Sequence, residues 1–250
     1  MCTVVFRFDP TAAYPFTLIG NRDELRDRPA KAPARHWPDR PEVIGGLDVQ
    51  ASGTWMALND AGVFATLLNA KQTLGPTDGK RSRGELPLDA LDFESAADAA
   101  EALETLDPAA YRAFNLIIAD ADAGFLLQND ETALRLTRVP PGLHMISHTN
   151  LNDPADPRVR WFRDVFERTP GPENPKQMAD WQPWGQIMGS QQGEDPANPL
   201  TALTIQTPFG FQTRCTALIG LGQDRPPVWW HRDREGDGDA GDLPFHNVID

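Results

Sequence analysis

Cys2 is the residue of this sequence with the clearest capacity for covalent chemistry. An aminopeptidase generally removes Met1 when a small residue follows, and Cys2 would then carry both a thiol and a free α-amino group. The α-amino pKa lies near about 7.7–8.0, so this amine can take the proton of the thiol and leave a nucleophilic thiolate. In the alternative interpretation, Cys2 is a small apolar residue that starts an edge strand.

A second group of polar side chains, Asn21-Arg22-Asp23-Glu24, directly follows a short apolar run. In the functional interpretation, Asp23 accepts hydrogen bonds from the terminal amine and orients it over the thiol, while Asn21 fixes the turn or donates to a substrate. In the alternative interpretation, the four residues form a solvated surface turn. Both interpretations place them in a polar turn, but only the first predicts that they are buried.

Three more polar residues are candidates for the site. Two of them lie at the expected ends of strands, and the third lies within an apolar stretch. Asn69 and Asn150 each end an apolar run and would otherwise serve as turn formers. If they converged near Cys2, their N–H groups would stabilise a developing oxyanion by about 3 kcal/mol per donor. Arg214 lies in an apolar setting, so it needs a carboxylate partner, for which we expect Asp23 or Glu24.

Neither the histidines nor the cysteines have metal-ligand spacing, because no HxxxH, HExxH or CxxC pattern occurs. We therefore expect no metal site and no required cofactor, and we interpret the five histidines as loop or structural residues. Core packing is the default interpretation of the seven tryptophans, with an apolar pocket as the alternative.

The elements that must position these residues read as antiparallel strand pairs with helices between them. The expected strands are 3–8, 16–20, 43–47, 54–58, 63–68, 114–119, 123–128, 134–136, 143–147, 200–206, 215–221 and 228–230. One or two helices are expected within 86–106 and another within 157–168, with Val159, Phe162, Val165 and Phe166 as its apolar stripe. The regions expected to lack regular structure are an extended loop over 30–41, an irregular insert over about 170–199 and an acidic tail over about 232–242.

Strict alternation of strands and helices is absent, as are a GxGxxG motif and a P-loop. This pattern argues against a Rossmann-type sheet and favours an α+β layered fold with extensive antiparallel sheet, built as one domain over 1–250.

The charge balance restricts the partners of the protein. A net charge of −13 repels phosphate backbones and anionic lipids, so we expect neither nucleic acid binding nor membrane insertion. The sequence has no signal-peptide pattern and no apolar run long enough to span a bilayer, so we expect a cytoplasmic protein. The arginine-rich, lysine-poor composition is typical of a GC-rich bacterial source.

Several short motifs together resemble those of the NRDE family, whose eukaryotic members are called transport and Golgi organisation proteins. The resemblance covers residues 1 to about 222. It rests on Met1-Cys2, Asn21-Arg22-Asp23-Glu24 with Arg28-Pro29, Gly53-Thr54-Trp55, Leu68-Asn69, Ser82 to Leu86, Phe114-Asn115-Leu116, Ser147 to Asn150 and Thr213-Arg214-Cys215-Thr216.

That family is more distantly similar to the cysteine branch of the N-terminal-nucleophile hydrolases, which includes bile-salt hydrolases, penicillin V acylases and penicillin acyltransferases. The resemblance implies an αββα sandwich with two mainly antiparallel sheets. It also implies that Cys2 is the nucleophile, that Asp23 contacts the amine, that Asn69 and Asn150 are the oxyanion and amine-contacting asparagines, and that Arg214 is the late active-site arginine. Asn21, Arg22, Glu24 and Trp55 are the candidate substrate-binding residues.

The sequence departs from the bile-salt hydrolases at Gly20, where those enzymes have an arginine before the Asn-x-Asp step; here Arg22 occupies the middle position. Two functions follow from the resemblance. The first is an N-terminal-cysteine amidohydrolase or acyltransferase acting on a small amide, ester or acyl thioester, and not on peptide bonds. The alternative is a non-catalytic carrier on the same scaffold that binds haem, an acyl lipid or acyl-CoA. A purely structural interaction protein is a third hypothesis.

Overall fold

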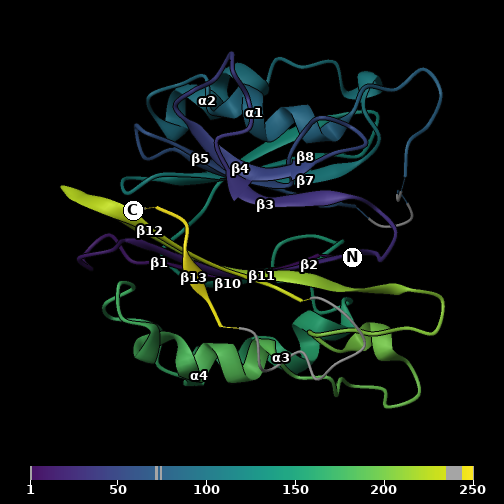
Figure 1. The fold of residues 1–250 in the computed structure, drawn as a ribbon, viewed down its shortest axis with the longest axis vertical. Coiled ribbons are helices and arrows are strands. Elements are labelled where there is room, and N and C mark those ends of the chain that lie inside the picture. Colours follow the sequence, from purple (N-terminus) through teal and green to yellow (C-terminus); the bar gives the residue numbers. More distant parts are fainter. Residues whose placement is uncertain (1, 71–72, 74, 235–243, 250) are drawn as a thin grey trace. The chain divides into compact units, whose positions relative to one another are not determined.

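A computed structural model describes residues 2–70, 73, 75–234 and 244–249 (Figure 1). Contacts between Cα atoms divide the chain into two compact units. Unit 1 combines residues 1–27 with 141–250, and unit 2 comprises residues 28–140. The candidate tail over about 232–242 lies mostly outside the described residues.

Unit 1 contains a six-stranded antiparallel sheet in the order β10-β1-β2-β11-β12-β13. Its first two strands form the expected hairpin, and strand β11 pairs with the other edge of β2. The strands are β1 (Thr3–Phe8), β2 (Phe16–Leu25), β10 (Gly142–Ile146), β11 (Phe211–Gly222), β12 (Arg225–Asp233) and β13 (His246–Asn247).

Strand β2 is longer than the sequence pattern predicted. The stretch Asn21-Arg22-Asp23-Glu24 belongs to the strand rather than to a turn after it, and Asn21, Arg22 and Asp23 are buried. A charged run can continue a central strand only if each side chain finds a partner, because a buried polar group without one is costly. The prediction of a turn was wrong, and the prediction of burial is confirmed.

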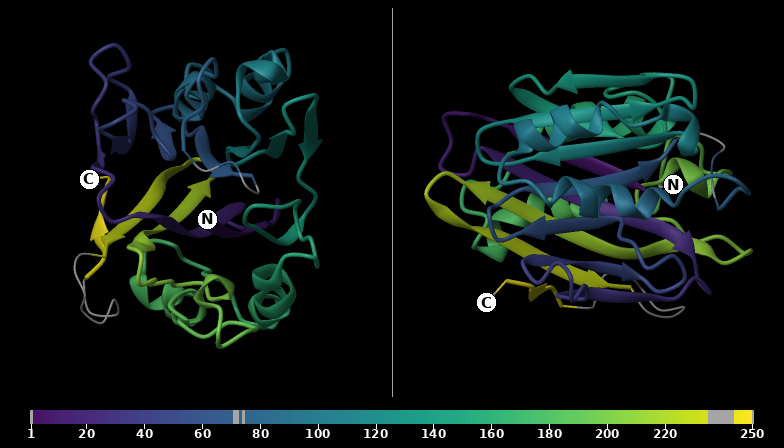
Figure 2. Two further views of the ribbon diagram at one scale, coloured as in Figure 1. Left: turned by 90° about the vertical axis from the view of Figure 1, so that its right-hand side faces the viewer. Right: turned by 90° about the horizontal axis from the view of Figure 1, so that it is seen from above.

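Helices α3 (Pro157–Arg168) and α4 (Met178–Met188) lie along one face of the unit 1 sheet (Figures 1 and 2). They contribute Phe166, Trp181 and Trp184 to a core that also contains Val5, Ile19 and Leu218 of the sheet. The stripe predicted for the first helix is confirmed at three positions, whereas Val165 is 38% exposed.

The segment 170–199 is not a wholly irregular insert, because it contains α4. Trp181, Trp184 and Met188 repeat at helical spacing and are all buried, and this packing outweighs the presence of Pro183 within the helix. The strand expected over 200–206 is also absent from the described residues; a short 3-10 helix (Pro199–Thr201) and one isolated bridge at Gln206 occupy this part of the chain.

Unit 2 contains a seven-stranded antiparallel sheet whose strands follow one another in chain order. The segment 30–41 was expected to be a loop, but its first part forms an exposed edge strand that contains Pro33, and proline is tolerated at a sheet edge. The strands are β3 (Ala30–Ala34), β4 (Val43–Asp48), β5 (Met56–Asn59), β6 (Phe64–Asn69), β7 (Phe114–Ala119), β8 (Gly124–Asn129) and β9 (Leu134–Arg138).

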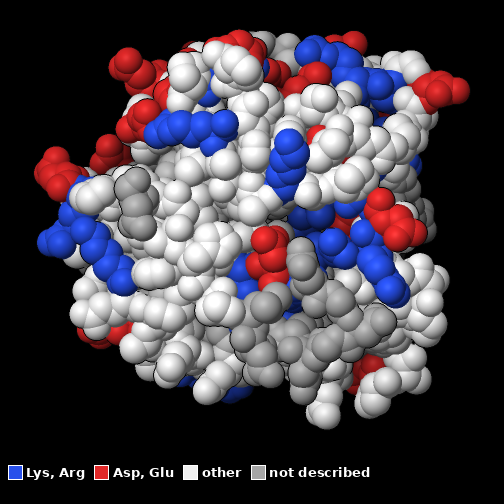
Figure 3. All heavy atoms as spheres, viewed as in Figure 1, with Lys and Arg blue, Asp and Glu red and all other residues white. Residues whose placement is uncertain are grey.

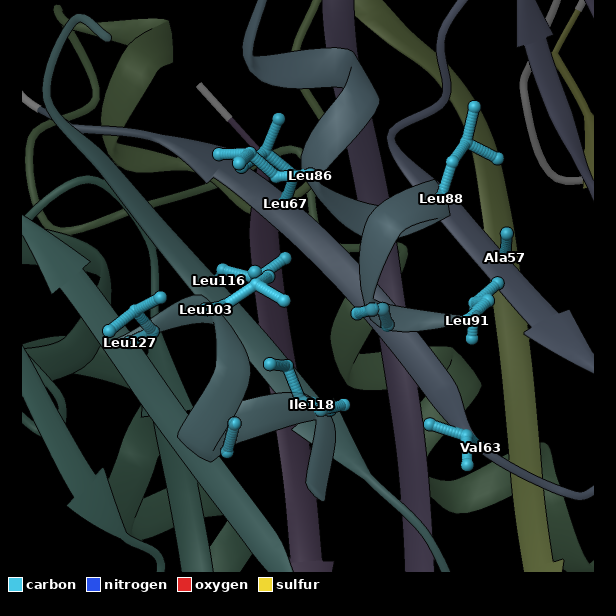
Figure 4. Close-up of a cluster of buried hydrophobic side chains, with 14 of the residues drawn as sticks. Ala57, Val63, Leu67, Leu86, Leu88, Leu91, Leu103, Leu116, Ile118 and Leu127 are labelled. Atoms are coloured by element: carbon cyan, nitrogen blue, oxygen red, sulfur yellow. The ribbon is translucent and has the colours of Figure 1, made fainter. Parts of the chain in front are cut away.

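Two helices, α1 (Leu86–Ala90) and α2 (Ala96–Leu103), cover one face of the unit 2 sheet (Figure 1). Ser95 caps α2 by accepting a hydrogen bond from the backbone of Asp98. Figure 4 shows leucines of both helices meeting side chains of the central strands, among them Leu116 and Ile118 of β7. This apolar layer covers one face of β6 and β7. The two strands are buried at nearly every position, as the sequence predicted for the first of them.

We expect Leu116→Ala to lower the free energy of unfolding by about 2–5 kcal/mol, because Leu116 is completely buried and its removal leaves a cavity. Chemical denaturation monitored by tryptophan fluorescence would measure this change. Leu134→Ala, at a partly buried edge position, is the matched control and should cost less. Equal costs for the two variants would contradict the assignment of this core.

The surface shows no single field of acidic charge on the face drawn in Figure 3, where acidic and basic side chains are interspersed with uncharged ones. Within the described part of the chain, no helix has both the length and the hydropathy that a membrane-spanning segment requires.

Candidate active site

The register of the unit 1 sheet brings Cys2, Arg22 and Cys215 into one row across three strands. Thr3 pairs with Asn21, so Cys2, the preceding residue, lies beside Arg22, and Cys215 pairs with Arg22 from the other side. Residues directly opposite one another on neighbouring strands share a face of the sheet. One guanidinium therefore lies between two thiols.

Cys2 is partly buried, and burial raises the pKa of its thiol. The nearby Asp23 carboxylate raises this pKa further, whereas a hydrogen bond from the Asp23 backbone amide and the charge of Arg22 lower it. The thiol therefore has stabilising groups for its anionic form, and it still needs a base to remove the proton.

Asp23 is held by a buried ion pair with Arg158 of α3. Arg158 Nη1 donates to Asp23 Oδ2 over 3.0 Å, and these side chains are 1% and 0% exposed, respectively. The Thr213 hydroxyl donates to the other carboxylate oxygen over 2.7 Å. Arg158 also donates to the Thr3 hydroxyl over 2.5 Å and to the Leu200 carbonyl over 3.0 Å. This network fixes the strand ends on either side of Cys2.

Asn21 forms hydrogen bonds within unit 1, and its substrate-binding role stays a prediction. Its amide nitrogen donates to the Leu203 carbonyl over 2.9 Å, and its oxygen accepts from the Thr216 hydroxyl over 2.7 Å. These partners hold the segment after α4 against the sheet. The side chain is 2% exposed and hydrogen-bonded at both ends.

The arginine bonded to Asp23 is Arg158 rather than the Arg214 that we expected. Strand β11 has an irregularity in its pairing with β2 between Thr213 and Cys215, and Arg214 is the extra residue there. A bulge of this kind redirects the side chain. A hydrogen bond from His231 lowers the pKa of the Asp233 carboxyl, and the charge of Arg214 adds to this effect.

Arg22 and Glu24 both lie on β2, two residues apart and thus on the same face. The Arg22 guanidinium is 6% exposed and lies 3.8 Å from the carboxylate of Glu24, which is 20% exposed. Arg22 lies in the row of Cys2, and its charge acts on the Cys2 thiol. Glu24 lies two residues further along β2, opposite Gln212.

The remaining candidates divide between the two units. Asn150 belongs to unit 1, where it follows β10 in a turn and is exposed. Asn69 and Trp55 belong to unit 2. Asn69 ends β6, as predicted, and the Trp55 ring packs directly on Gly46, where an added Cβ would lie 2.2 Å from it. The roles that the resemblance implies for Asn69 and Asn150 stay predictions.

Three histidines are held by neighbouring side chains. His144 contacts Asn152 over 3.0 Å, His231 contacts Asp233 over 2.9 Å, and His148 contacts the Ser147 hydroxyl over 2.8 Å. Among the residues that the structure describes, no cluster of three or more metal-ligating side chains occurs.

Sequence reasoning missed two residues of the site, Arg158 and Thr213. Arg158 is four residues before Phe162 and therefore lies on the buried stripe of its helix, a signal that was available. Thr213 lies in the motif that contains Arg214, and there the threonine hydroxyl rather than the arginine contacts Asp23. Of the two residues, Arg158 was easier to identify from the sequence, because a charged residue on the apolar stripe of a helix needs a buried partner.

We expect iodoacetamide to modify Cys2 and to spare Cys215 in the folded protein. Burial raises the pKa of Cys215 to about 12, so its thiolate fraction near neutral pH is negligible, and its side chain is 4% exposed. Peptide mapping after alkylation would locate the adduct. Modification of both cysteines at similar rates would contradict this arrangement.

Solved structures of amide hydrolases share the fold of this chain. An N-acylethanolamine-hydrolyzing acid amidase orthologue from Caenorhabditis elegans has a TM-score of 0.55 and 12% identity, covering 87% of this chain and 92% of its own. Penicillin V acylase from Agrobacterium tumefaciens has a TM-score of 0.52 and 12% identity, with coverage of 93% and 83%. A mutant of the conjugated bile acid hydrolase from Clostridium perfringens has a TM-score of 0.52 and 11% identity, with coverage of 99% and 92%.

At these identities the likeness shows the fold alone. It confirms the predicted α+β class, with two mainly antiparallel sheets and an N-terminal-nucleophile hydrolase-like fold.

The sequence comparisons show the family. The Transport and Golgi organization protein 2 homolog of Bos taurus is 36% identical over 132 residues, which cover 49% of this chain and 46% of the bovine protein. The family model described as Transport and Golgi organisation 2 matches residues 1–228. The chain therefore belongs to the Transport and Golgi organisation 2 family, as its short motifs predicted.

Proposed function

We propose that this protein is an N-terminal-cysteine amidohydrolase or acyltransferase that acts on a small amide, ester or acyl thioester. The observation that carries the proposal is the position of Asp23, whose carboxylate is fixed by Arg158 and Thr213 and whose backbone amide donates to the Cys2 sulfur. The fold shared with three amide hydrolases supports the same reaction class. The matched stretch covers less than half of the bovine relative, so we infer no activity from the family membership alone.

The first step uses the amine that removal of Met1 would leave on Cys2. The amine takes the thiol proton, and the thiolate attacks the carbonyl carbon of the substrate to form a C–S bond and an oxyanion. Burial disfavours the charged thiolate, so the proton leaves only when a base is adjacent. In this proposal, Asp23 holds that amine in its orientation.

The second step breaks the bond to the leaving group. The ammonium returns its proton to the leaving nitrogen, oxygen or sulfur as the carbonyl re-forms, which leaves a thioester on Cys2. Water attacks this thioester to give a carboxylic acid, or an acceptor molecule attacks it to give a transferred acyl group. In either case the thiol is regenerated, and no oxidant or metal is required.

According to the resemblance, Asn69 and Asn150 would stabilise the oxyanion. Amide N–H groups are suitable donors for this charge, at about 3 kcal/mol per donor. Their assignment is part of the proposal.

The proposal is tested by incubating the protein with nitrophenyl esters, acyl anilides and acyl thioesters of several chain lengths. We expect a rapid burst of leaving group, equal to the amount of protein with a free Cys2 amine, followed by slower turnover. Absence of both burst and turnover for every member, in protein that lacks Met1, would refute the proposal. Saturable binding of haemin or palmitoyl-CoA without turnover would instead support the carrier function.

A further inference from the structure

The row Cys2–Arg22–Cys215 places a cation where the reactive sulfur must become an anion. Arg22 lies on the strand next to Cys2, and a pair of directly opposite residues has Cβ atoms roughly 4.5–5.5 Å apart. A guanidinium has a longer reach than this separation. The positive charge therefore lies beside the sulfur on the same face of the sheet.

We propose that Arg22 is a positioning residue that stabilises the thiolate form of Cys2 and so sets how readily this sulfur reacts. This inference rests on Cys2 being the reactive group of the proposed function. It adds a second source of activation: the terminal amine removes the proton of the thiol, and the positive charge of Arg22 stabilises the resulting thiolate.

The electrostatics of both thiols agree with this position. The charge of Arg22 lowers the pKa of Cys2 and that of Cys215, against the burial that raises both. This agrees with the register, in which the Arg22 position lies between those of Cys2 and Cys215. The carboxylate of Asp23 opposes Arg22 at Cys2, and the carboxylates of Asp233 and Asp23 oppose it at Cys215.

Glu24 limits the effect of Arg22. Its carboxylate lies 3.8 Å from the guanidinium and draws part of the positive field away from the sulfur. Removal of this carboxylate should therefore make Cys2 more reactive, while removal of the guanidinium should make it less reactive. These opposite signs distinguish an electrostatic role from a purely structural one.

Arginine suits this role better than lysine at a buried position. A guanidinium stays protonated under all ordinary conditions, whereas a buried ammonium readily loses its charge. Arg22 is 6% exposed, so a lysine at this position would provide only part of the stabilisation.

The test is the rate at which iodoacetamide alkylates Cys2 over a range of pH in four proteins: wild type, Arg22→Gln, Arg22→Lys and Glu24→Gln. Near neutral pH we expect Arg22→Gln to slow alkylation about tenfold and to move its pH profile toward alkaline values. Arg22→Lys should restore part of the rate, and Glu24→Gln should exceed the wild type.

Cys215 reports on folding in the same experiment, because it becomes alkylated if the sheet opens. If Arg22→Gln proves to be unfolded by this measure, Glu24→Gln, at a partly exposed position, carries the test. An unchanged rate in folded Arg22→Gln, or a rate in Glu24→Gln at or below the wild type, would overturn the inference. Because alkylation needs no acyl substrate, a failed hydrolase assay leaves this result unaffected.

Discussion

Replacing Cys2 by alanine is expected to lower acyl-transfer turnover about a thousandfold or more. The reason is that the proposed reaction passes through a covalent bond to this sulfur, and alanine can form none. Burst kinetics with an activated ester would measure both the loss of turnover and the loss of the burst.

Cys215→Ala is the matched control for this variant, since Cys215 lies in the same row of the sheet. It removes a buried thiol whose pKa is raised to about 12, so turnover should stay close to the wild-type value. If Cys2→Ala kept the burst, or if Cys215→Ala removed it, Cys2 would not be the nucleophile.

The second large effect concerns stability. We expect Arg158→Met to lower the free energy of unfolding by about 3–5 kcal/mol, because it leaves the Asp23 carboxylate buried without its cation. Denaturant titration would measure the change, which should be accompanied by slower reaction at Cys2.

Arg160→Met provides a control in the same helix. Arg160 forms an ion pair with Glu194, but the two side chains are 47% and 32% exposed, so removal of this pair should leave stability nearly unchanged. A double variant that combines Arg158→Met with Asp23→Asn should cost clearly less than the sum of the two single changes. Additive costs, or equal effects of the two arginine variants, would contradict the assignment of Arg158.

The sequence predicted most strands of both sheets because their apolar runs are bounded by turn residues. It failed at Asn21 to Glu24, where the charged residues indicated a turn and the chain instead continues in a central strand. Local propensity cannot show that Thr213 and Thr216, nearly two hundred residues later, provide hydrogen-bond partners for this run. The pairing of distant strands determined the outcome.

The candidate site was partly predictable for the same reason. Cys2 and Asp23 could be named because their chemistry is informative in isolation and because the short motifs resemble a family. The partner of Asp23 could not be named, since the choice between Arg158 and Arg214 depends on a bulge in β11 and on which face of α3 is buried. Likewise, the helix within 170–199 was hidden by its prolines and glycines, although its buried tryptophans are spaced as in a helix.

The central claim is that Cys2, with a free α-amino group, is the nucleophile, and one measurement tests it most directly. The intact mass of the purified protein, taken before and after exposure to a β-lactone probe, reports both the removal of Met1 and the formation of an adduct. We expect a chain that starts at Cys2 and gains one probe molecule on its N-terminal peptide. A chain that lacks Met1 and gains no adduct there would contradict it.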